Sequence, residues 1–130
     1  SMDELNATLD IFPNVDIILT HGFNESLLQE IEKKSTGYDV GMSIYKKDEI
    51  RKCDILQVPM IDEFIPLLDE TYHLRSIFGR GNKLKDHTIK ECLDEAFNTK
   101  VGKIVVGVDK LTHLKKIVES LMEDSNGLER

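Results

Sequence analysis

Apolar residues gather in five short runs along this chain, and a stretch with helical spacing follows each run. Two of the runs nearly repeat one another, Val15-Asp16-Ile17-Ile18-Leu19 and Cys53-Asp54-Ile55-Leu56-Gln57. Near-continuous apolar character is typical of strands that are buried on both faces, and such strands occur mainly in parallel sheets covered by helices. The pattern therefore predicts strands at about residues 15–20, 39–44, 53–58, 73–78 and 103–108.

The stretches beside these strands place apolar residues three and four positions apart, as amphipathic helices do. Asn24 and Thr112 are expected to act as N-caps, because their side chains accept hydrogen bonds from the first turn of a helix. Pro66 must lie in a first turn or break its helix. Helices are thus predicted at residues 3–12, after Asn24, at 46–51, 61–68 and 85–97, and from Thr112 onward.

Strict alternation of helices and strands, joined by right-handed crossovers, predicts an α/β fold with a parallel sheet. We expect a single domain over residues 1–130. It is built either as a five-stranded (β/α) half of a TIM-type barrel or as an open, doubly wound sheet. Ser1 is interpreted as the remnant of a tag, and the polar residues 124–130 as a tail that frays.

Composition narrows the function classes. The 130 residues are 40% hydrophobic, enough for a core, and the net charge of −7 argues against a general nucleic-acid or anionic-membrane surface. No apolar run approaches the roughly 20 residues that span a bilayer, and no signal peptide opens the chain, so we expect a cytoplasmic protein. Cys53 and Cys92 are expected as buried, reduced thiols. The histidines lack metal-ligand spacing, so no metal site is predicted.

Ligands of parallel α/β folds bind at the carboxyl ends of the strands. His21 at a strand end either orients a carbonyl substrate or caps a loop. Gln57 must hydrogen-bond a ligand or the neighbouring backbone, because a buried amide needs a partner. Gly79-Arg80-Gly81 reads as a phosphate-binding turn or as a plain flexible turn, and Lys110 precedes a helix N-terminus, which favours anions.

The strand ends together resemble strands four to eight of the aldo-keto reductase barrel. The resemblance covers about residues 3–122 and rests on five segments in the right order: Val15 to His21, Val40-Gly41-Met42-Ser43, Cys53 to Pro59, Arg75-Ser76-Ile77-Phe78, and Val105 to Asp109. Members of this family bind NADP(H) across the barrel mouth and transfer hydride to a carbonyl. The resemblance therefore implies the portion of an oxidoreductase site that holds the cofactor.

The resemblance also implies roles for individual residues. His21 matches the histidine of the family's catalytic group, whose Asp, Tyr and Lys come from the first half of the barrel, which this sequence does not contain. Ser43 and Gln57 match the residues that bind the nicotinamide carboxamide. Arg75-Ser76 lies where a stacking aromatic residue and a Ser are common. Gly79, Arg80 and Lys110 lie where the loops would hold the pyrophosphate or the ribose phosphate.

Half a barrel leaves two sheet edges and one face uncovered, and such surfaces favour association. We expect a homodimer that covers the open side, a rearranged open sheet, or a separate polypeptide that supplies the first half. Three hypotheses follow: an NADP(H)-binding half-barrel that is incomplete for catalysis by itself, one subunit of a split carbonyl reductase, and a non-catalytic protein-interaction module.

Overall fold

A computed structural model describes the backbone of residues 1–22, 24–34 and 37–128, with side chains up to residue 123. Its five strands all run parallel and pair in the order β1-β2-β3-β4-β5. The predicted α/β class with a five-stranded parallel sheet is confirmed. The strands are β1 (Ile17–His21), β2 (Asp39–Ser43), β3 (Ile55–Pro59), β4 (Tyr72–Arg75) and β5 (Lys103–Ile104).

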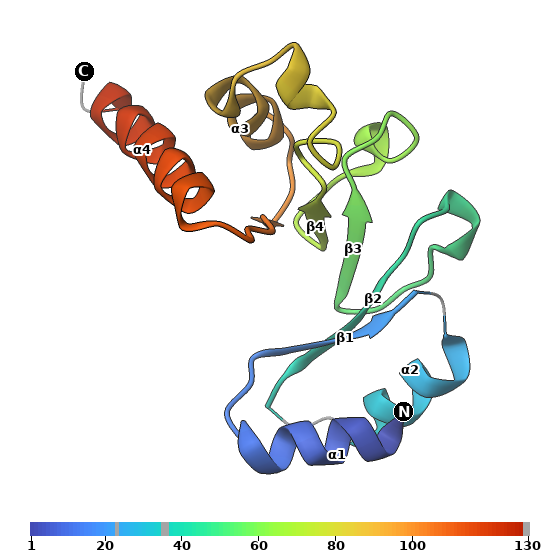
Figure 1. Cartoon of the computed structure of the whole chain (residues 1–130). Coiled ribbons are helices and arrows are strands. Elements are labelled where there is room, and N and C mark those ends of the chain that lie inside the picture. The colour runs from blue at the N-terminus through green and yellow to red at the C-terminus, as the bar shows by residue number, and fades with distance from the viewer. Residues whose placement is uncertain (23, 35–36, 129–130) are drawn as a thin grey trace.

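The strand order follows the chain order without a reversal. A doubly wound sheet needs a point at which the order reverses, whereas successive βα units of a barrel pair in sequence. The order therefore favours the half-barrel over the doubly wound alternative. Figure 1 shows the elements following a curve, with α1 and α2 at one end and α3 and α4 at the other.

The helices begin where the sequence supplies capping side chains. Asn24 Oδ1 accepts a hydrogen bond from the Leu27 amide at 3.1 Å, so the predicted cap is confirmed. Thr88 and Glu91 form a reciprocal capping box at the start of α3. The helices are α1 (Met2–Ile11), α2 (Glu25–Lys34), α3 (Ile89–Phe97) and α4 (Leu111–Leu128), with 3-10 turns at Lys47–Glu49, Ile65–Leu67 and Lys83–Lys85.

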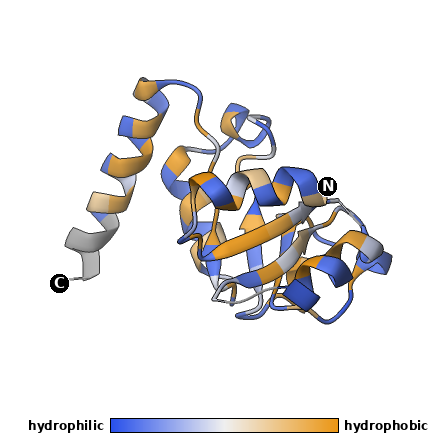
Figure 2. Cartoon of the chain, turned by 90° about the horizontal axis from the view of Figure 1, so that it is seen from below, coloured by the Kyte–Doolittle hydropathy of each residue, from blue (hydrophilic) through white to orange (hydrophobic). Residues whose placement is uncertain are grey.

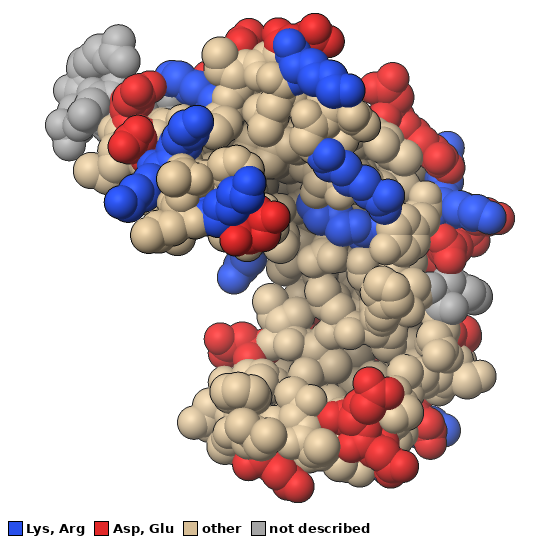
Figure 3. All heavy atoms as spheres, viewed as in Figure 1, with Lys and Arg blue, Asp and Glu red and all other residues tan. Residues whose placement is uncertain are grey.

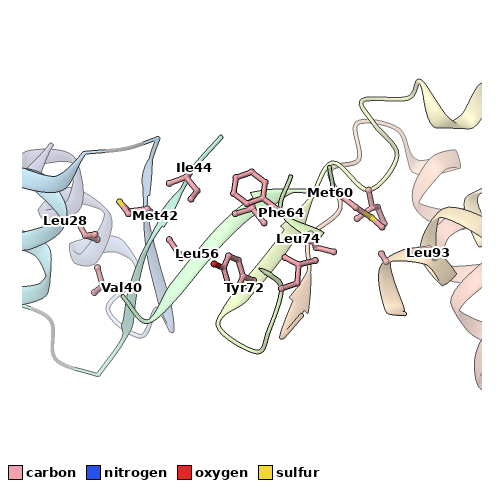
Figure 4. Close-up of a cluster of buried hydrophobic side chains, with 14 of the residues drawn as sticks. Leu28, Val40, Met42, Ile44, Leu56, Met60, Phe64, Tyr72, Leu74 and Leu93 are labelled. Carbon is pink, nitrogen blue, oxygen red and sulfur yellow. The ribbon is translucent and has the colours of Figure 1, made fainter. Parts of the chain in front are cut away.

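One face of the sheet forms the hydrophobic core. Successive strand residues point to opposite faces, so a period of two collects the apolar side chains on the face that the helices cover. Figure 4 shows this layer, in which Phe64 lies against the strands and Leu28 and Leu93 come from helices on either side. The buried strand residues of this face are Val40, Met42, Leu56, Val58, Tyr72 and Leu74.

Several predicted elements are shorter than expected, and the helix predicted at 46–51 is only the 3-10 turn Lys47–Glu49. The helix predicted at 61–68 is only the 3-10 turn Ile65–Leu67, because Pro66 lacks the amide that continues a helix. The strand predicted at 73–78 ends at Arg75, since Ser76 adopts a left-handed φ of 56°. The strand predicted at 103–108 is only β5, which pairs with β4 over two register positions.

Helix boundaries also differ from the predictions. The helix predicted at 85–97 begins at Ile89, because the Thr88 capping box starts it there. Thr112 does not cap α4 but lies inside its first turn. The tail predicted to fray is helical as far as Leu128, while residues 129–130 lie outside the described part of the chain. Cys53 is half-buried just before β3, Cys92 is buried in α3, and both are free thiols.

Candidate functional site

A row of polar side chains crosses the sheet on the face opposite the core. Each of its members is the register partner of the next, one from each strand. In β2 and β4 these residues alternate with the buried core residues, so they point away from the helices. The members, called the polar row below, are His21, Ser43, Gln57, His73 and Lys103.

Ser43, Gln57 and Arg75 form a hydrogen-bond network at the carboxyl ends of β2, β3 and β4. The Ser43 hydroxyl donates to Gln57 Oε1 at 3.1 Å. Arg75 Nη1 donates to Ser43 Oγ at 2.8 Å and to the Gln57 carbonyl at 2.9 Å. Arg75 Nη2 donates to the Ile44 carbonyl at 2.8 Å. The guanidinium of Arg75 thereby connects β4 to β3 and to the end of β2.

Arg75 carries a positive charge that no carboxylate neutralises among the described residues. Its hydrogen-bond acceptors are all neutral, and its guanidinium stacks on the Tyr45 ring at 4.3 Å from the centroid. Partial burial lowers the pKa of Arg75, and the charge of Arg80 lowers it further. Two arginines close together without an acidic partner form a local site for an anion.

A cavity of about 740 Å³ opens beside this network, beyond the ends of β3, β4 and β5. A second cavity of about 390 Å³ shares Phe78, Leu84, Gly107, Val108 and His113 with the first, and Lys116 adds another cation to its lining. The two adjoining cavities are called the trough below. The first is lined by Gln57, Arg75, Ser76, Ile77, Phe78, Arg80, Gly81, Leu84, Val105, Val106, Gly107, Val108, Asp109 and His113.

The loop after β4 holds Arg80 at the trough in a constrained backbone. Ser76 and Arg80 have φ values of 56° and 57°, which residues with a Cβ seldom adopt. Gly79 and Gly81 also have positive φ, and the Gly79 amide donates to the Ser76 carbonyl at 2.9 Å. Such strain is held in place only where surrounding contacts impose it, and it is common at binding sites.

The structure brings together most, but not all, of the residues that the sequence singled out. Gln57, Arg75, Ser76 and Arg80 line the trough, and Ser43 bonds to two of them. Gly79 shapes the loop without lining the trough. Lys110 is exposed and does not line it either, so its contact with a phosphate stays a prediction.

His21 lies away from the trough. It is the register partner of Ser43, but it lines a separate groove between α1 and β1. The polar row runs across the sheet from the groove beside His21 to the trough beside Gln57. His21 and Gln57 thus belong to one register row but line different cavities.

Sequence reasoning assigned no function to His73, Lys103, Tyr45 or Lys116. His73 is buried, and its pKa is lowered first by burial and then by the Lys103 charge. In β4, His73 and Arg75 alternate with apolar residues, and this alternation could have predicted that the face of the sheet opposite the core is polar. Tyr45 stacks on Arg75 only because its loop folds back toward β4, and no local sequence pattern predicts that fold of the loop.

The fold and the site define a singly wound α/β domain with a cationic cavity at the carboxyl end of its sheet. No protein-family model matches the chain, and searches among curated proteins and among solved structures find no match. Within the described ranges no group of three or more His, Cys, Asp or Glu residues is arranged to hold a metal ion. Among the helices that the structure describes, none combines the length and the apolar character needed to cross a bilayer.

Proposed function

We propose that this half-barrel binds NADP(H) in the trough, as the part of an aldo-keto-reductase-like site that holds the cofactor. The observation that carries the proposal is the pair Arg75 and Arg80, which borders a cavity of about 740 Å³ without an acidic ion-pair partner in the described part of the chain. Guanidinium groups bind phosphate with two parallel hydrogen bonds. The trough extends from them toward Lys116 and passes His113 and Asp109, whose Nδ1 and Oδ1 lie 3.8 Å apart. This length suits an elongated ligand whose phosphates lie at the arginines and at Lys116.

The nicotinamide end of the ligand belongs beside Gln57. Its Oε1 accepts from Ser43, while its Nε2 has no hydrogen-bond partner among the described residues and remains a donor for a carboxamide oxygen. The Ser43 hydroxyl hydrogen is already directed to Gln57. We therefore assign the carboxamide contact to Gln57, with Ser43 and Arg75 holding that side chain in position.

Turnover by this chain alone is not part of the proposal. In aldo-keto reductases the carbonyl is protonated by a Tyr, and the present chain matches only the histidine of that catalytic group, at His21. His21 lies in β1, three strands away from Arg75 in β4. The proposed activity is cofactor binding, and hydride transfer requires groups from another polypeptide.

Titration of NADPH fluorescence with the protein tests the proposal. Saturable binding with a Kd below about 1 mM is expected. Arg75→Ala and Arg80→Asn should each raise the Kd by about tenfold or more, because each removes a charge-assisted contact to phosphate. Asn is chosen at position 80 because it tolerates the left-handed backbone there.

Lys34→Ala is the matched control, since Lys34 is an exposed cation on α2, outside the trough. It should leave the Kd unchanged. Gln57→Leu should weaken NADPH but not inorganic pyrophosphate, which competes only for the arginines. Absence of binding at millimolar NADPH rejects the proposal.

A further inference from the structure

Both edges of the sheet are open in the described part of the chain. β1 pairs with β2 on one side, β5 pairs with β4 on one side, and neither has a second neighbour among the described strands. Unpaired edge strands present backbone donors and acceptors that another strand can use. The chain therefore offers two strand edges of the same direction at opposite ends of one sheet.

Uncovered apolar side chains accompany both edges. α4 packs against α3 and buries Ile117, but the apolar stripe beside Ile117 is exposed, with Leu111 66% exposed. Figure 2 shows α4 at the margin of the molecule with hydrophobic residues along its length. At the opposite end, Ile11 and Phe12 are 71% and 61% exposed. The stripe, called the α4 stripe below, consists of Leu111, Leu114, Val118, Leu121 and Met122.

The two ends carry opposite charge. Residues 1–22, which contain α1 and β1, have four acidic residues and no Lys or Arg. Residues 100–118, which contain β5 and the start of α4, have five lysines and one aspartate. Figure 3 shows Asp and Glu predominating on the arm that carries α1 and Lys and Arg on the arm that carries α4. Like ends repel and unlike ends attract.

We propose that a second copy of this chain closes the open sheet, with the β1 and α1 end of each copy docked on the β5 and α4 end of the other. A two-fold axis parallel to the strands creates both seams at once and keeps every strand parallel. It also places each acidic end beside a basic end and covers the α4 stripe with the end that carries Ile11 and Phe12. Closed two-fold assemblies are the most common among homo-oligomers.

The surface charges indicate which polypeptide docks on the two open edges of the sheet. A copy docked with like ends together would bring four acidic residues against four, or the lysines against each other. The head-to-tail arrangement is therefore specific to a partner that carries both ends, and this chain is such a partner. The proposal does not depend on the ligand of the trough.

Light scattering coupled to size-exclusion chromatography tests the assembly. The measured mass of the wild type is expected to be twice that of the 14.9 kDa chain. Lys110→Glu with Lys115→Glu neutralises the basic end, and Asp10→Lys with Asp16→Lys neutralises the acidic end, so each double variant removes the attraction at both seams of its own dimer. Each double variant should dissociate, with a dimer Kd raised about tenfold or more. All four residues are exposed, and none lines the trough.

Mixing the two double variants is the decisive step. In the mixed dimer the unchanged acidic end of one variant meets the unchanged basic end of the other at one seam, and the two neutralised ends meet at the second seam. A mixed dimer should therefore form from two monomeric proteins, because one attractive seam is restored. Lys33→Glu with Lys34→Glu makes the same charge change on α2 and should leave the wild-type dimer intact, and far-UV circular dichroism checks that each variant is folded. A monomeric wild type overturns the proposal and leaves the edges to a different polypeptide. A dimer that survives both double variants, or monomers that fail to combine on mixing, overturns it as well.

Discussion

His73 combines burial with a position beside a cation. It lies in the middle of the polar row, next to Lys103 in register, and both burial and that charge lower its pKa below the ordinary value of about 6.5. The unfolded chain therefore binds a proton more readily than the folded protein. Consequently His73 stabilises the fold above about pH 6.5, and this contribution is lost as the pH falls below that value.

Denaturant unfolding between about pH 7.5 and 5.5 measures this effect. As the pH is lowered, the free energy of unfolding should decrease more steeply for the wild type than for His73→Gln, whose amide does not titrate. Equal slopes for the wild type and His73→Gln would show that His73 has the same proton affinity in both states.

At the scale of elements, β2 and β3 approach each other closely at Gly41. Gly41 is the register partner of Ile55, and a Cβ on Gly41 would overlap the Ile55 carbonyl oxygen. Gly41→Ala should destabilise the protein by about 2–4 kcal/mol, because backbone must move to relieve the overlap. Gly107→Ala is the control, since no other atom lies within 4 Å of the added Cβ. Urea unfolding compares the two, and similar stabilities would contradict the predicted overlap.

At the scale of the whole molecule, stability should depend on protein concentration. If two copies close the sheet, the folded dimer is favoured by mass action, so raising the protein from about 1 to 100 μM should raise the Tm by several degrees. High salt should reduce that shift, because it screens the attraction between the acidic and basic ends. Calorimetry at several concentrations measures both effects. A Tm that does not change with concentration would argue for a monomer.

Much of the fold could be predicted from the sequence because strand burial leaves a local trace. The apolar runs predicted the number and the parallel direction of the strands, and Asn24 predicted the start of α2. Parallel strands end at one edge of a sheet, so Ser43, Gln57 and Arg75 could be expected to meet there, and they do.

What the sequence by itself determined about this protein is how many strands form and that they run parallel, since both follow from local periodicity and from the alternation of strands with helices. Only the tertiary structure decided where strands stop, how β4 aligns His73 with Gln57, and that His21 lines a different groove from Arg75. Those features depend on contacts between residues far apart in the chain. Neither a hydrogen bond such as that from Arg75 to the Ile44 carbonyl nor the left-handed turn at Ser76 appears in the spacing of neighbouring residues.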